Sequence, residues 1–125
     1  MNYMMLIAGG RDYQDVDRMI RHIEKVIERE GRNVTIIEGD AKGADRIAGN
    51  VARQHGLVVE VYPADWDKIG KSAGFVRNKR MADRVAKHIE NGGSGSVVLF
   101  PGGRGTDHMR RTAIEMGLPV YSPVR

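Results

Sequence analysis

The stretch from Val97 to Thr106, which reads Val-Val-Leu-Phe-Pro-Gly-Gly-Arg-Gly-Thr, decides the fold of this chain. Its four apolar residues predict a buried strand, which Pro101 ends because proline cannot continue the hydrogen-bond ladder. The three glycines leave no Cβ between the backbone and a ligand, and Thr106 begins a segment with helical spacing. A strand, a glycine turn and a helix start together point backbone N–H groups at an anion, although a tight turn without a ligand is the alternative.

Four other strand-length apolar runs and four helical stripes make up most of the remaining sequence. We expect the other strands at 3–8, 34–37, 57–62 and 119–122. We expect helices between Asp15 and Gly31, from Ala44 to Gly56, from Phe75 to Ile89 and from Thr106 to Gly117. Two segments interrupt this pattern: a long irregular loop from Pro63 to Gly74 and a flexible linker from Asn91 to Ser96.

The alternation of strands and helices predicts an α/β fold with a parallel sheet. Right-handed crossovers make it one Rossmann-like, doubly wound domain over residues 1–125, with helices on both faces of a five-stranded sheet in the order 3-2-1-4-5. In such sheets ligands bind beyond the carboxyl ends of the strands where the order reverses, here between the first and fourth strands. Gly9-Gly10-Arg11 and the turn from Pro101 to Thr106 follow these two strands, so a binding crevice is expected between them.

Composition narrows the chemistry and the partners. The chain has 125 residues, of which 41% are hydrophobic and 29% charged, and a formal net charge of +4 that suits an anionic partner. The absence of cysteine excludes disulfides, thiolate chemistry and cysteine-based zinc sites, and the four histidines lack metal-like spacing, so we expect neither a metal nor a cofactor. The apolar run from Met4 to Ala8 is too short for a membrane or secretory segment, which favours a cytoplasmic location and no membrane partner.

Three loops at the expected crevice combine glycines with charged residues just before a helix. Helix N-termini supply partial positive charge there, and Arg11, Lys42 and Arg104 add full charges against phosphates, unless each is only a solvated surface residue. The candidate ligand-binding residues of these loops are Gly9, Gly10, Arg11, Gly39, Asp40, Lys42, Gly43, Asp45, Pro101, Gly102, Gly103, Arg104, Gly105 and Thr106.

A further candidate segment runs from Gly74 to Met81. Arg77 falls in the first turn of a helix, where the macrodipole disfavours a cation, so it makes more sense facing a phosphate or carboxylate. Asn78 can hydrogen-bond a ligand or a neighbouring loop, or cap locally. Trp66, the single tryptophan, offers either an aromatic face for a base or a core anchor for its loop.

These motifs together resemble the SLOG superfamily, which groups the LONELY GUY (LOG) phosphoribohydrolases with the DprA DNA-processing proteins. Within it the chain most resembles the YspA, cpYpsA-related branch. The resemblance implies that the Pro-Gly-Gly turn holds a nucleotide phosphate, that Arg77 takes the place of the LOG active-site arginine, and that the protein is a homodimer or higher homo-oligomer. It rests on Gly9-Gly-Arg-Asp-Tyr13, Gly39-Asp-Ala-Lys-Gly-Ala-Asp45, Ala64-Asp-Trp66, Gly74-x-x-Arg-Asn-x-x-Met81 and Phe100-Pro-Gly-Gly-x-Gly-Thr106.

One position departs from the LOG pattern. Where LOG enzymes carry a glutamate that works on the N-glycosidic bond, this chain has Met109, whose thioether can neither accept a proton nor stabilise positive charge. Asp107 lies about 200° further round the helix, so it is a poor substitute. If the protein is an enzyme, we expect Arg77 to act with Asp40 or Asp45.

Three functions remain open. The leading hypothesis is binding of a nucleotide or nucleotide-derived small molecule, of the ADP-ribose, NAD-derivative or nucleoside-phosphate class, by a sensor or sequestering module. The second is a LOG-like N-glycosidic or phosphoribosyl hydrolase. The third is DprA-like binding of single-stranded DNA, which the basic balance favours but the lack of aromatics interleaved with basic residues disfavours.

Overall fold

The computed structural model describes residues 2–123 and has a five-stranded sheet in the order β3-β2-β1-β4-β5. Every neighbouring pair of strands is parallel, which confirms the predicted fold class and strand order. The elements in chain order are β1 (Tyr3–Ala8), α1 (Val16–Glu30), β2 (Val34–Glu38), α2 (Ala44–Gln54), β3 (Val58–Val61), α3 (Trp66–Ile69), the 3-10 helix η1 (Gly70–Ser72), α4 (Ala73–Glu90), β4 (Ser94–Leu99), α5 (Arg104–Glu115) and β5 (Val120–Tyr121).

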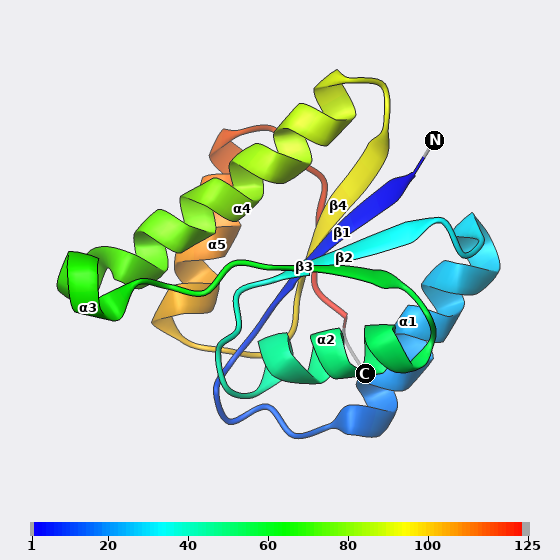
Figure 1. The fold of residues 1–125 in the computed structure, drawn as a ribbon, viewed down its shortest axis with the longest axis horizontal. Helices are drawn as coiled ribbons and strands as arrows, with labels where there is room; N and C mark the ends of the chain where they lie inside the picture. Colours follow the sequence, from blue (N-terminus) through cyan, green and yellow to red (C-terminus); the bar gives the residue numbers. More distant parts are fainter. Residues whose placement is uncertain (1, 124–125) are drawn as a thin grey trace.

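Helices cover both faces of the sheet. In Figure 1, α1 and α2 lie on one side of the strands and α4 and α5 on the other. Each side has its own apolar cluster: Met5 and Ile7 of β1 contribute to the cluster under α1 and α2, whereas Met4 and Leu6 contribute to the one under α4 and α5. Because successive side chains of a strand point to opposite faces, a strand buried on both sides must be apolar throughout, as β1 is.

The ends of the elements follow from local chemistry. The Asp15 side chain accepts a hydrogen bond from the Arg18 backbone N–H at 3.0 Å and so begins α1 as predicted, and Gly31 ends this helix with a φ of 82°. β3 lies at the edge of the sheet, and its Val58 is 62% exposed. An apolar run therefore predicted this strand correctly but not its burial, since burial depends on its place in the sheet.

The prediction of a flexible linker from Asn91 to Ser96 is wrong in its second half. Ser94, Gly95 and Ser96 belong to β4 and pair with Tyr3, Met4 and Met5 of β1. A Cβ at Gly95 would lie 2.8 Å from the Met4 carbonyl oxygen and 3.2 Å from Cγ1 of Val85. The glycine therefore allows close approach of strand and helix, which sequence alone cannot distinguish from flexibility.

The segment from Pro63 to Gly74 is also more regular than predicted. It contains α3, η1 and the first two residues of α4, which begins at Ala73 rather than near Phe75. The Asp65 side chain accepts a hydrogen bond from the Lys68 N–H at 3.1 Å and caps α3. α5 likewise begins earlier than predicted, at Arg104. Short capped turns such as α3 have too few residues to show helical periodicity.

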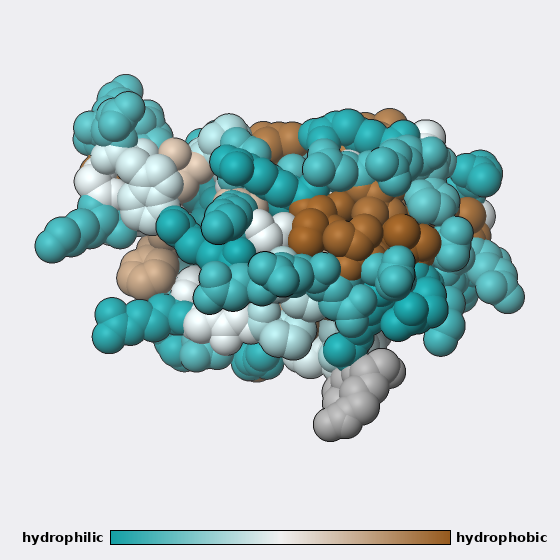
Figure 2. Space-filling model, turned by 90° about the horizontal axis from the view of Figure 1, so that it is seen from below, coloured by the Kyte–Doolittle hydropathy of each residue, from teal (hydrophilic) through white to brown (hydrophobic). Residues whose placement is uncertain are grey.

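The surface on the side of α1 and α2 is mostly hydrophilic, with its most prominent apolar patch near the middle of this face (Figure 2). Within residues 2–123, none of the helices has the length and apolar character needed to cross a lipid bilayer.

Candidate functional site

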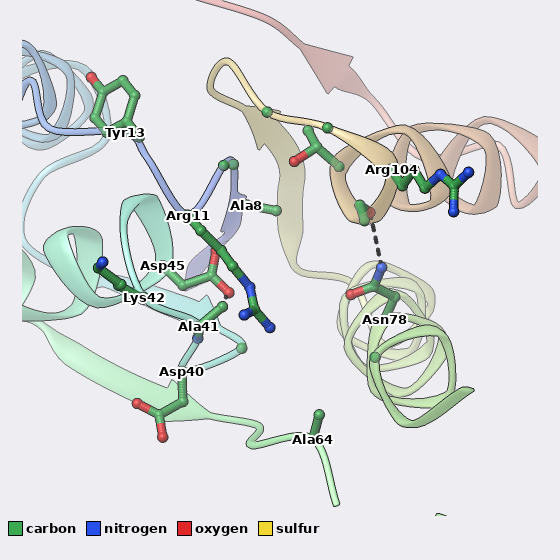
Figure 3. Close-up of a pocket in the computed structure, with 18 of the residues that line it drawn as sticks. Ala8, Arg11, Tyr13, Asp40, Ala41, Lys42, Asp45, Ala64, Asn78 and Arg104 are labelled. Atoms are coloured by element: carbon green, nitrogen blue, oxygen red, sulfur yellow. Dashed lines mark hydrogen bonds between the residues drawn. The ribbon is translucent and has the colours of Figure 1, made fainter. Parts of the chain in front are cut away.

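A cleft of about 1020 Å³ opens at the carboxyl edge of the sheet, where the strand order reverses between β1 and β4. Its walls are the loops that follow β1, β2 and β4, together with the segment leading into α4 (Figure 3). The volume lies at the upper end of the range for small-molecule sites.

The glycine turns after β1 and β4 are joined directly. The Gly10 N–H donates a hydrogen bond of 2.8 Å to the Pro101 carbonyl, and a Cβ on Gly10 would lie 2.9 Å from the Gly102 Cα. The Gly10 carbonyl in turn accepts from the N–H groups of Tyr13 at 3.2 Å and Ala44 at 3.1 Å. Side chains are therefore excluded where the two turns meet, and the backbone itself forms this wall of the cleft.

The loop after β2 is built on two buried carboxyl groups. Glu38 is 2% exposed and accepts a hydrogen bond from the Asp40 N–H, while Asp45 is 4% exposed and accepts one from the Ala41 N–H at 3.4 Å. Burial raises the pKa of Glu38 to about 7, against the opposing effect of the Asp40 N–H. Burial also raises the pKa of Asp45 to about 6, although Arg77 and several backbone N–H groups favour its ionised form.

Asp40, which lies between Glu38 and Asp45 in the sequence, has a left-handed backbone conformation with a φ of 60°. This conformation is uncommon for residues other than glycine, although aspartate and asparagine adopt it more readily than most. The Asp40 carboxylate forms an ion pair of 3.2 Å with Arg46.

Arg77 and Asn78 connect the loops to α4 and α5. Arg77 donates hydrogen bonds to the Gly39 carbonyl and, at 3.0 Å, to Oδ1 of Asn78. Burial lowers the pKa of Arg77, and the nearby carboxyl groups of Asp45 and Glu38 oppose this shift. Asn78 is 4% exposed, and its Nδ2 donates to the Gly105 carbonyl at 3.1 Å, the dashed line in Figure 3. The amide of Asn78 is thus engaged within the protein and holds Arg77 in place.

The three cations predicted to face phosphates lie differently. The Arg11 guanidinium reaches into the middle of the cleft, whereas the side chains of Lys42 and Arg104 point away from it (Figure 3). Trp66 also lines the cleft and is 48% exposed. The alternative prediction, that this side chain is an anchor in the core, is therefore wrong, and the side chain is accessible to a ligand in the cleft.

The residues predicted to bind the ligand surround this one cleft, with the exception of Gly43. Those that line it are Gly9, Gly10, Arg11, Gly39, Asp40, Lys42, Asp45, Trp66, Arg77, Asn78, Pro101, Gly102, Gly103, Arg104, Gly105 and Thr106. Gly43 instead precedes α2 with a φ of 92°, where a Cβ would lie 2.6 Å from the Arg11 carbonyl oxygen and closer still to that of Gly10. Gly43 therefore does not line the cleft, but it allows the loop before α2 to pack closely against the turn at Gly10 and Arg11.

Replacing Gly43 by alanine is expected to lower the free energy of unfolding by about 3–4 kcal/mol, because strain at positive φ adds to a clash of the new Cβ with the Gly10 and Arg11 carbonyl oxygens. Gly31→Ala is the matched control, since Gly31 has a φ of 82° but no atom within 4 Å of its built Cβ. It should lose only about 1–2 kcal/mol. Urea denaturation of both variants measures the difference, and equal losses would show that the clash is relieved by a shift of the loop.

Sequence reasoning missed several residues of the cleft. Gln14, Lys71 and Phe75 line it, and Glu38 lies buried beneath it. The signal for Glu38 was available, because a carboxylate ending an apolar strand just before Gly39-Asp40 is out of place unless it serves the loop.

Glu38 predicts a measurable pH dependence of stability. Because its folded pKa, about 7, lies above the unfolded value of 4.5, the folded state binds the proton more tightly. Its contribution to stability is therefore full below pH 4.5 and is lost as the pH rises through 7. Urea denaturation across this range should show a fall in the free energy of unfolding that is smaller for Glu38→Gln, whose amide oxygen can still accept from the Asp40 N–H. The fall that remains in this variant comes from Asp45, whose pKa is also raised, to about 6. Parallel pH profiles for the two proteins would contradict the raised pKa.

The position that corresponds to the LOG glutamate lies outside the cleft. Met109 is 0% exposed and belongs to the apolar cluster under α4 and α5. Asp107 is exposed and does not line the cleft. Among residues 2–123, no group of three or more histidine, aspartate or glutamate side chains is placed to hold a metal ion.

Comparison with known proteins agrees with this architecture. The sequence model of the YspA, cpYpsA-related SLOG family matches residues 4–69. The chain belongs to this family. Gene 61 protein of Mycobacterium phage D29 is 34% identical to this SLOG protein over 125 residues, covering 94% of each chain.

A solved structure shows the same fold. DNA processing protein A (DprA) from Streptococcus pneumoniae superposes with a TM-score of 0.70 over 99% of the SLOG chain, at 18% sequence identity. The chain spans about half the length of DprA, 51% of it. At this identity the likeness establishes the Rossmann-like fold alone.

Proposed function

We propose that residues 1–125 form one nucleotide-binding domain that holds a nucleotide or nucleotide-derived small molecule in the cleft and acts as a sensor or sequestering module. The observation that carries the proposal is the junction of two glycine turns, through Gly10 and Pro101, at the reversal of strand order. Such a junction leaves backbone N–H groups and the start of α5 free to approach a phosphate. The ligand belongs to the nucleoside-phosphate or ADP-ribose class.

Each part of the cleft has a complementary part of such a ligand. The phosphates lie against the turn from Gly102 to Gly105. Arg11, whose guanidinium stands in the middle of the cleft, is the cation that faces the ligand. The exposed ring of Trp66 offers a stacking surface for the base. The carboxylate of Asp45 can accept hydrogen bonds from ribose hydroxyl groups.

A thermal-shift series tests this function. AMP, ADP-ribose and NAD should raise the melting temperature in proportion to the logarithm of their concentration, because they bind the folded state alone. Adenosine, which lacks phosphate, should raise it much less. The absence of a shift with every adenine nucleotide tested, at millimolar concentration, would overturn the proposal.

Hydrolysis of an N-glycosidic bond is the second candidate, favoured by the placement of a carboxyl group of raised pKa beside Arg77. Asp45, with a pKa of about 6, can exchange a proton near neutral pH, whereas the half-buried Asp40 is paired with Arg46. Incubation with AMP should then release adenine, and Asp45→Asn should abolish release. Binding without any product would leave the sequestering function alone.

Two partner proposals accompany this function, single-stranded DNA and a second copy of the chain. The net charge of +4 and the DprA-like fold favour the first, and the family resemblance favours the second. Affinity for an oligonucleotide that falls steeply with salt would support DNA binding. Sedimentation equilibrium of the apo protein tests the homodimer. A cytoplasmic location remains part of the proposal.

A further inference from the structure

A second hollow adjoins the cleft. It is a groove of about 430 Å³ between α4 and α5, and the residues that line it are Phe75, Val76, Lys79, Arg80, His108 and Thr112. Phe75 lines both the groove and the cleft, so the two hollows adjoin at this side chain. Phe75 is 46% exposed and Val76 40%, which leaves apolar surface uncovered where the two hollows meet.

Two of the side chains that line the groove are stacked aromatic rings. The Phe75 and His108 ring centroids are 4.1 Å apart, with an interplanar angle of 16°. Nδ1 of His108 lies 3.2 Å from Nδ2 of Asn78, an amide donor, so Nδ1 accepts and the proton is on Nε2. Burial and Arg111 lower the pKa of His108, opposed by Glu115, so the stack is uncharged at neutral pH.

The charges around the groove favour an anion. Lys79 and Arg80 line it, and no carboxylate is among the described residues that do so. Lys79 forms an exposed ion pair of 2.7 Å with Asp83, and screening by solvent and salt makes this pair weak. The guanidinium of Arg80 lies over the ring of Tyr62, 5.5 Å from its centroid. A flat aromatic surface beside two cations is the combination that binds a base joined to a phosphate.

We propose that the groove is a second nucleoside subsite, which takes the second base of a phosphate-linked dinucleotide whose first nucleotide occupies the cleft. The proposal rests on the nucleotide-binding function proposed above and narrows its ligand class to nucleotides that carry two bases. The adjacency of the two hollows at Phe75 is what a phosphate-linked ligand requires, because its two halves must bind within reach of a short linker. Lys79 and Arg80 then face the phosphates of the second nucleotide.

Isothermal titration with AMP and with the linear dinucleotide pApA tests the subsite. In the unmodified protein pApA should bind about tenfold more tightly than AMP, since one stacked base contributes about this much. Val76→Glu places a carboxylate in the groove and should reduce the affinity for pApA to that for AMP, leaving AMP binding unchanged. Ile114→Glu is the matched control, because Ile114 is 59% exposed on α5 and lines neither hollow. It should behave as the unmodified protein.

The possible outcomes distinguish failure of the second subsite from failure of the nucleotide-binding function on which it rests. If AMP binds and pApA binds no more tightly, the subsite is overturned and the nucleotide-binding function stands. If neither binds, the nucleotide-binding function itself fails. If a twelve-residue oligo(dA) binds far more tightly than pApA, with a steep dependence on salt, the groove follows single-stranded DNA and the dinucleotide is the wrong ligand. If Val76→Glu changes the sedimentation mass instead, the groove is an interface between copies.

Discussion

Replacing Met109 by glutamate is expected to lower the free energy of unfolding by about 4 kcal/mol at neutral pH. The substitution restores the residue type that LOG enzymes carry at this position, but Met109 is fully buried in an apolar cluster. A carboxylate placed there would be surrounded by the apolar side chains of this cluster, and an unpaired buried charge costs several kcal/mol. Urea denaturation measures the loss, which should shrink as the pH falls and the carboxyl group becomes protonated.

Met109→Leu is the control for packing at this position. It keeps the volume and apolar character of the side chain and should cost less than about 1.5 kcal/mol. A stable Met109→Glu variant that releases adenine from AMP would show that the side chain can reach the cleft, contrary to its buried place on α5. The expected result, instability without new activity, would agree with the buried place of this side chain outside the cleft.

Replacing Gly103 by valine is expected to weaken nucleotide binding by about a hundredfold, equivalent to about 2.8 kcal/mol, while the protein stays folded. Gly103 lines the cleft, has a φ of −113° that other residues adopt, and has no atom within 4 Å of its built Cβ. The valine side chain therefore meets no protein atom but fills space that the phosphate needs. Titration with AMP measures binding, and urea denaturation should show a loss of about 1 kcal/mol for valine at the N-cap of α5.

Gly102→Ala provides the contrast to this variant. A Cβ on Gly102 would lie 2.7 Å from the Gly10 backbone nitrogen and closer still to Oγ1 of Thr106, so the two glycine turns must separate. This variant should lose both affinity and a large part of its stability, whereas Gly103→Val should lose affinity with only the small loss of stability given above. A folded Gly103→Val protein with unchanged affinity for AMP would show that the turn has only a structural role.

Most of the fold could be predicted because its signals are local. Apolar runs such as Tyr3–Ala8 identify strands, and the Asp15 cap and Gly31 bound a helix within a few residues. The parallel order follows from the alternation of these elements. The errors fell where local composition is ambiguous: Ser94–Ser96 is strand although its residues resemble a linker, and the edge position of β3 leaves Val58 exposed.

The amino-acid sequence by itself determined where the cleft lies, since strand order and the glycine turns at Gly10 and Gly102 follow from spacing along the chain. Only the tertiary structure decided what each side chain does there. Arg11 enters the cleft while Arg104 points away, and Asn78 is engaged within the protein. The physical reason is that strand and turn preferences depend on neighbouring residues, whereas burial, pKa and side-chain direction depend on atoms brought together from distant segments.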